Sequence, residues 1–155
     1  MREKQGEIQK IEGLSDLQQE LHEFLLKMAK KKPDTFISRK EILLKIKGYG
    51  YKGEENLYNA PSATELGKDI QFLKTSGRVD KAILPRSGAF GGVKYATSDE
   101  ELRIIRKRAL RELVQKAYMY RIASGKTAKN GQISFDFFDE EEEGYLKEIR
   151  AIVNA

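Results

Sequence analysis

The sequence contains no cysteine and only one histidine, His22, among its 155 residues. A disulfide framework is therefore excluded, and so is a zinc site built from cysteines or from several histidines. No segment approaches the roughly 18 uninterrupted apolar residues of a membrane helix, and the first ten residues, MREKQGEIQK, lack the apolar core of a signal peptide. We therefore expect a cytoplasmic protein that does not enter a membrane.

Signals for catalysis are also scarce. The residues SGKT at 124–127 match the last four residues of the phosphate-binding loop motif. Tyr120, however, occupies the position of that motif's first glycine. The acidic run from Asp139 to Glu143 offers consecutive carboxylates, which hold no fixed separation for acid–base chemistry. We expect no enzyme, no catalytic residue, no cofactor and no metal site, although a magnesium site made of carboxylates alone stays open.

The length and the charge of the chain limit the number of domains and the kinds of partner that we expect. One domain of about 100 residues with some appended helix fits this length. The net charge of +5 and the pI near 9.3 permit attraction to nucleic acid without proving it. Residues 101–130 carry nine Lys and Arg against two Glu, whereas residues 136–148 carry seven Asp and Glu against one Lys. A basic block followed by an acidic block predicts two surfaces with different partners.

Four segments carry the same helix-start signal, a serine followed three residues later by Gln or Glu. These capping boxes begin at Ser15, Ser38, Ser62 and Ser98. Apolar residues then repeat at helical spacing, and a proline or a glycine closes each segment, at Pro33, Gly48, Gly77 and Gly125. The predicted helices span residues 15–32, 37–48, 62–76 and 99–124.

Two short strand-type runs lie between the third and fourth helices, at Val79–Leu84 and Val93–Ala96. The intervening PRSGAFGG contains a proline that cannot donate to a sheet and glycines that tolerate a turn, so we predict a hairpin with a loose tip. Arg86 and Lys94 are expected at or beside this tip. The last residues, GYLKEIRAIVNA, predict a short amphipathic helix at 144–155.

The order of three helices and a two-stranded hairpin predicts a mainly α fold with a small β-hairpin, a winged helix-turn-helix at residues 15–97. An N-terminal arm (1–14) precedes it, and a basic helical extension (98–125) and a docking tail (126–155) follow. The runs ISRKEILLKI, DIQFLKTSGRVDKAIL and GGVKYATSDEEL resemble the small winged-helix proteins encoded by phages of low-GC Gram-positive bacteria, over residues 36–138. This resemblance implies a winged-helix fold and a location in a bacterial or phage-infected host cell. It implies little about the biochemical role of the protein.

In a winged helix-turn-helix, the helix at 62–76 would be the recognition helix, which presents its first residues to base edges in the major groove. Glu65 is unfavourable there, because a carboxylate held in a capping box weakens phosphate binding. The predicted contacts to double-stranded DNA are Ser62, Thr64, Lys68, Gln71 and Lys74 on this helix, Arg86 and Lys94 on the hairpin, and Arg103, Arg106 and Lys107 on the next helix. The function would be transcription regulation or DNA replication. Alternatively, these polar faces are only solvated, and the domain is an interaction module or an inhibitor that docks a host protein.

The basic helix at 99–124 has two faces of interest. Its basic residues are spread over too wide an arc to form a single stripe. A run of this density can nevertheless bind along a phosphate backbone. The residues are Arg103, Arg106, Lys107, Arg108 and Arg111. Its apolar stripe is Leu102, Ile105, Ala109, Leu113, Ala117 and Tyr120. Packing of this stripe on the winged helix and pairing with a second copy, as a homodimer, both stay open.

The densest aromatic cluster follows the turn signal Asn130-Gly131. The spacing of a glutamine, an aliphatic residue and two phenylalanines resembles the bacterial sliding-clamp-binding peptide, with Phe135 where that family usually has leucine. The resemblance implies the clamp as a partner, held through Gln132, Ile133, Phe135, Phe137 and Phe138. Alternatively, the apolar side of this segment packs on the protein's own core. The acidic run after it either stays solvated or shields the basic helix.

Overall fold

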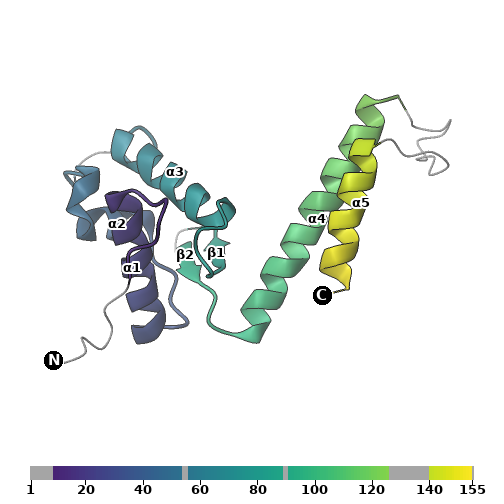
Figure 1. Cartoon of the computed structure of the whole chain (residues 1–155). Coiled ribbons are helices and arrows are strands. Elements are labelled where there is room, and N and C mark those ends of the chain that lie inside the picture. Colours follow the sequence, from purple (N-terminus) through teal and green to yellow (C-terminus); the bar gives the residue numbers. More distant parts are fainter. Residues whose placement is uncertain (1–8, 54–55, 89–90, 126–139, 155) are drawn as a thin grey trace. The chain divides into compact units, whose positions relative to one another are not determined.

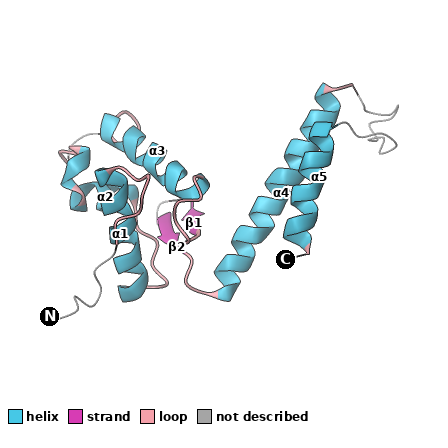
Figure 2. Cartoon of the chain, in the orientation of Figure 1, coloured by secondary structure: helices cyan, strands magenta, loops and turns pink. Residues whose placement is uncertain are grey.

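The computed structural model describes residues 9–53, 56–88, 91–125 and 140–154, and it is mainly helical with a small two-stranded antiparallel sheet (Figures 1 and 2). This confirms the predicted combination of helices with a small β-hairpin. The chain divides into two compact units, unit 1 (residues 1–101) and unit 2 (residues 102–155).

Unit 1 contains three helices followed by the hairpin. In chain order its elements are α1 (Asp16–Lys31), α2 (Arg39–Lys45), the short 3-10 helix η1 (Lys47–Tyr49), α3 (Pro61–Thr75), β1 (Ile83–Arg86) and β2 (Gly92–Tyr95). Helix α4 (Asp99–Ala123) begins at the end of unit 1 and continues into unit 2, which also contains α5 (Glu140–Val153).

Helix α1 begins with the capping box that the sequence predicts. The Ser15 hydroxyl accepts from the Gln18 backbone at 3.1 Å, and the Gln18 side chain accepts from the Ser15 backbone at 2.9 Å. Two otherwise unpaired N–H groups are satisfied in this way, which fixes where the helix starts. Leu21 and Leu25 then lie fully buried on the inner face of α1.

Helix α2 begins where predicted but ends differently. The Ser38 hydroxyl accepts from the Glu41 backbone at 3.1 Å, as a cap should. Gly48 was expected as the left-handed terminator, but it lies inside η1, and the left-handed residue is Gly50 with φ of 73°. The extra turn of η1 carries Tyr49 into the core, where it is 5% exposed.

The start of α3 corrects a prediction. The first helical residue is Pro61 and the N-cap is Ala60, so the expected capping box of Ser62 and Glu65 is absent. The fixed φ of proline is already helical and its missing N–H costs nothing at the first position, so Pro61 starts the helix before the serine. Ser62 therefore sits inside the first turn, where it is 5% exposed.

The hairpin bonds to the segment that precedes α2. Its register pairs Ile83 with Tyr95 and Pro85 with Val93, so β1 starts later than predicted and includes the proline. On its other edge β2 pairs with Ile37 through backbone hydrogen bonds of 2.9 and 3.0 Å between Ile37 and Val93. A Cβ on Gly92 would lie 2.0 Å from the Ile37 carbonyl oxygen, so only glycine fits at this crossing.

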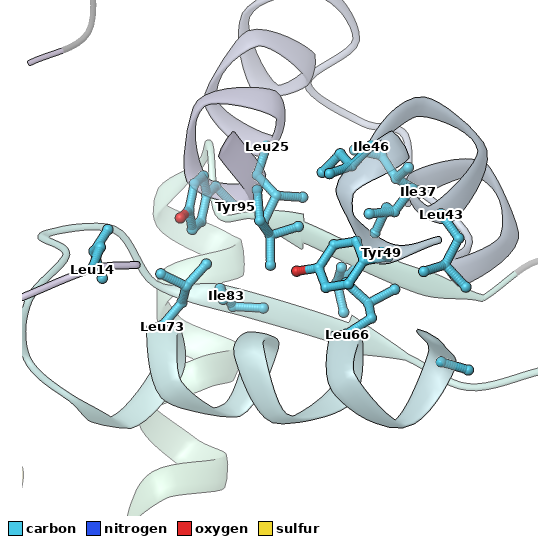
Figure 3. Packing of buried hydrophobic residues seen from close by; sticks show 14 of the residues in the cluster. Leu14, Leu25, Ile37, Leu43, Ile46, Tyr49, Leu66, Leu73, Ile83 and Tyr95 are labelled. Carbon is cyan, nitrogen blue, oxygen red and sulfur yellow. The ribbon is translucent and has the colours of Figure 1, made fainter. Parts of the chain in front are cut away.

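One apolar core holds unit 1 together. Leu66 and Leu73 point from α3 into this core, where Leu25 from α1, Leu43 from α2 and Ile83 from β1 meet them (Figure 3). All the residues of this buried cluster come from positions 14–95. The core thus fixes which side of α3 faces inward, and the opposite side is left to solvent.

His22 lies in this core and bonds to the hairpin. Its Nδ1 is 2.7 Å from the Tyr95 hydroxyl, and the side chain is 3% exposed. Burial lowers the pKa of His22, against the opposing influence of Asp80 and Glu23. Burial also raises the pKa of Tyr95, so its hydroxyl keeps its proton. The folded state therefore favours a neutral imidazole.

We expect the free energy of unfolding to fall as the pH drops below 6.5, the ordinary pKa of His22. The unfolded chain takes up a proton at His22 at a higher pH than the folded protein does, so acid favours unfolding. Urea denaturation at several pH values between about 5.5 and 7.5 measures this slope. His22→Gln does not titrate and should flatten it; an equally steep slope in that variant would assign the effect to another group.

Candidate nucleic-acid interface

The outer face of α3 is a row of exposed polar side chains. Thr64, Lys68, Gln71 and Thr75 are all exposed and follow one another at helical spacing, directly opposite the buried Leu66 and Leu73. Lys74, also exposed, lies at the margin of this row. We call Thr64, Lys68, Gln71 and Thr75 the α3 row. Its members combine one positive charge with groups that both donate and accept hydrogen bonds.

A buried carboxylate anchors the inner side of α3. Asp69 is 8% exposed, and its two oxygens accept from the Tyr49 hydroxyl at 2.8 Å and from the Gln18 amide at 3.1 Å. Burial and the bond to Asp69 raise the pKa of Tyr49, which keeps the phenol as a donor. These bonds tie α3 to α1 and η1, and so fix the rotation of the α3 row. The role of Asp69 has no signal in the sequence, because its partners Tyr49 and Gln18 are distant in the chain.

Two residues at the start of α3 lie differently from the prediction. Ser62 was expected to contact DNA, but it is buried on the inner side, and its Oγ has no hydrogen-bond partner. Glu65 is exposed and is not held in a capping box. Its charge is one of the smaller causes of the raised pKa of Tyr49. Glu65 stands three residues before Lys68, so the two side chains are neighbours on the surface of α3.

The hairpin presents one of its two predicted basic residues. Arg86 at the end of β1 is exposed, and its guanidinium carbon lies 5.5 Å from the centroid of the Phe36 ring. A cation near an aromatic face is attracted by the ring's quadrupole, so this contact restrains Arg86 at the strand end.

Lys94 corrects the other half of that prediction. It lies in the middle of β2 rather than at a loose tip, and it is 2% exposed. Its ammonium donates to the Glu101 carboxylate at 2.6 and 2.8 Å and also to the Pro33 carbonyl. Its charge is therefore neutralised inside unit 1 and is not presented to a phosphate.

Glu101 holds this arrangement from the first turn of α4. Its carboxylate also accepts from the backbone and the hydroxyl of Thr97, both at 3.0 Å. Burial opposes ionisation of Glu101, but the bonds from Lys94 and Thr97 outweigh it and lower the pKa of this carboxyl. The predicted capping box of Ser98 is therefore only half formed: Ser98 accepts from the Glu101 backbone at 3.2 Å, while the Glu101 side chain bonds elsewhere.

The basic residues of α4 are exposed, as predicted from their length and charge. This group comprises Arg103, Arg106, Lys107, Arg108 and Arg111. The predicted inner stripe is only half-buried from Ile105 to Tyr120, and Leu102 is 38% exposed.

The C-terminal helix α5 begins inside the acidic run, at Glu140, and so earlier than the predicted start at residue 144. Glutamates suit the first turn of a helix because the free N–H groups there carry partial positive charge. Glu142 is buried and bonds to Arg121 of α4 at 2.6 Å, with side-chain exposures of 3% and 4%. At Glu142 the acidic run is therefore paired with α4 and not solvated.

The predicted clamp-binding residues lie outside the described part of the chain. This applies to Gln132, Ile133, Phe135, Phe137 and Phe138. The clamp prediction therefore stays a prediction from sequence.

No family model, no curated protein and no solved structure matches this chain. Within the described residues, no helix has both the length and the apolar character needed to cross a membrane. The described side chains also contain no group of three or more His, Cys, Asp or Glu placed to hold a metal ion.

Proposed function

We propose that unit 1 is a winged helix-turn-helix that binds double-stranded DNA, with α3 as the recognition helix and the β1–β2 hairpin as the wing. The observation that carries this proposal is the α3 row, a continuous polar face that the core and Asp69 hold outward. Lysine and glutamine on such a face match the acceptors and donors at base edges in the major groove. The order of three helices followed by a hairpin supports the same reading.

The proposed contacts differ in what they do. Lys68 and Gln71 lie in the middle of the α3 row and read bases, with Thr64 beside them. Lys74 at the margin of α3 and Arg86 at the strand end contact phosphates, which position the protein without reading sequence. Arg106 and Lys107 lie in unit 2 and are proposed as phosphate contacts of that unit. Ser62 and Lys94 are buried and are not proposed as contacts.

Binding should weaken steeply as salt is added, because phosphate contacts release condensed counterions. Fluorescence anisotropy of a labelled random duplex, titrated with the full chain over a salt series, measures this slope. A shallow slope with tight binding would assign affinity to something other than phosphate contacts. No binding at low salt would favour the alternative, an interaction module that docks a protein, including the sliding clamp through residues 132–138.

Lys68→Ala and Gln71→Ala should each lower the affinity for a selected specific site by about 1 to 3 kcal/mol. The physical reason is the loss of a contact to a base edge. The site comes from selection of bound fragments from a genomic library, which also distinguishes an operator from a replication region. Lys27→Ala on α1 is the matched control, since it removes an exposed lysine outside the proposed surface. Unchanged affinity in both α3 variants would remove the recognition-helix assignment.

A further inference from the structure

A groove on unit 1 lies between α1 and the end of α2. It has a volume of about 830 Å³, and its described lining comes from α1, from the last residue of α2 and from Ile46 directly after it. The floor is apolar, because Phe24 and Met28 are half-buried there and Ile46 is buried. All three residues lie in the core of unit 1 or pack against it, so the floor is held in place and can receive an apolar side chain from outside.

Four exposed lysines border this groove, and they are Lys27, Lys30, Lys31 and Lys45. Within the described part of the chain, no carboxylate lies within ion-pair distance of any of them. The groove also contains two glutamates towards the start of α1, Glu20 and Glu23, but the Glu23 carboxylate already accepts from the Gln19 amide at 3.3 Å. The border therefore carries an excess of positive charge that no described group of the protein pairs.

The apolar floor and the lysine border together determine which kind of ligand suits the groove. A nucleic-acid backbone would pair with the lysines but would place nothing apolar on Phe24 and Met28. An acidic peptide satisfies both parts, because its carboxylates pair with the lysines while its aliphatic or aromatic side chains cover the floor. Helices with one apolar face bind apolar grooves in this way.

We propose that the groove between α1 and α2 docks an acidic amphipathic helix of a partner protein. The apolar face of that helix lies on Phe24 and Met28, and its carboxylates pair with Lys30 and Lys31 at the end of α1. The groove shares no residue with the proposed DNA contacts. The docking site therefore stands or fails independently of DNA binding.

Fluorescence anisotropy of a labelled synthetic peptide, titrated with the full chain, tests this proposal. The peptide is helical, with leucines along one face and glutamates on the other faces. We expect saturable binding that Lys30→Glu/Lys31→Glu weakens by about 10-fold or more, because like charges then face the peptide. The matched control is Arg39→Glu/Lys40→Glu, which makes the same change of charge at two exposed residues outside the groove and should weaken binding far less. Far-UV circular dichroism checks that each variant keeps its helices.

Two further peptides separate the apolar contribution from the charge. A peptide of the same composition, with its leucines distributed around the helix, should bind about 10-fold more weakly, because it cannot cover the floor with one face. A peptide with lysines in place of the glutamates should not bind. Backbone amide NMR spectra recorded with the acidic peptide should show their largest shift changes near Phe24 and Met28.

Three results would overturn the proposal. The first is the absence of saturable binding by the acidic peptide. The second is an equal loss of binding in Lys30→Glu/Lys31→Glu and in Arg39→Glu/Lys40→Glu, which would mean that net charge rather than the groove attracts the peptide. The third is displacement of the peptide by a random duplex that itself shifts the amides near Phe24 and Met28, which would assign the groove to nucleic acid.

Discussion

Glu101→Ala is expected to destabilise unit 1 by about 3 to 5 kcal/mol, the usual cost of leaving one partner of a buried ion pair behind. The partner left behind is the Lys94 ammonium, which is 2% exposed and, among the described residues, would keep the Pro33 carbonyl and the Thr97 hydroxyl as acceptors. Urea denaturation followed by tyrosine fluorescence measures the change. A loss below about 1 kcal/mol, the usual value of an exposed pair, would mean that solvent reaches this site.

Removal of the lysine instead of the glutamate should lower the free energy of unfolding much less. Lys94→Met removes the buried charge itself, and the Glu101 side chain that remains is 18% exposed and can be hydrated. We expect a loss of about 1 to 2 kcal/mol. The double variant Lys94→Met/Glu101→Ala should then be more stable than Glu101→Ala alone. This ordering follows from the unequal burial of the two groups, and equal losses in the two single variants would contradict it.

Arg121→Ala is expected to separate α5 from α4. The guanidinium and the Glu142 carboxylate are both almost completely buried, so removal of the arginine leaves an uncompensated buried charge that costs about 3 to 5 kcal/mol. Unit 2 has no described buried apolar residue to offset that cost. Hydrogen–deuterium exchange should show loss of protection in α5 while α1, α2 and α3 stay protected.

The matched control for this prediction replaces both charges. Arg121→Leu/Glu142→Leu removes the buried charges together and supplies apolar volume, which is often neutral or stabilising. Protection of α5 should therefore be retained in the double variant. Loss of protection there as well would mean that the helices associate through a specific polar geometry rather than through relief of a buried charge.

The start of α1 could be predicted because its signals are local. Ser15 and Gln18 are three residues apart, and each satisfies the other's backbone. The start of α3 could not be decided in the same way, because two local signals competed. Ser62 suggested a cap, but Pro61 starts the helix and turns the serine inward. A shift of the N-cap by two residues, from Ser62 to Ala60, was enough to remove Ser62 from the exposed face.

The predictions for Lys94 and Glu142 were wrong for a different reason, because each residue contacts a partner that is distant in the sequence. Lys94 reads as an exposed basic residue in a hairpin, but the Pro33 carbonyl that binds it is 61 positions away. Glu142 reads as one of several solvated acids, but Arg121 binds it from 21 positions away. In both cases charge alone predicted exposure, and a partner distant in the chain reversed it.

The α3 row is the part of the candidate site that the sequence predicted best. Helical spacing placed Thr64, Lys68 and Gln71 on the side away from Leu66, and the structure exposes all three. Periodicity determines a face without any knowledge of distant partners. The Asp69 anchor that holds this face outward needed the fold, because its partners come from α1 and η1.

The central claim is that the α3 row contacts the duplex. Backbone amide NMR spectra of the full chain, recorded with and without a duplex at low salt, test it most directly. We predict the largest shift changes at Thr64, Lys68 and Gln71, with smaller changes near Arg86. Shift changes confined to α4 and α5, or none at all in α3, would contradict the account.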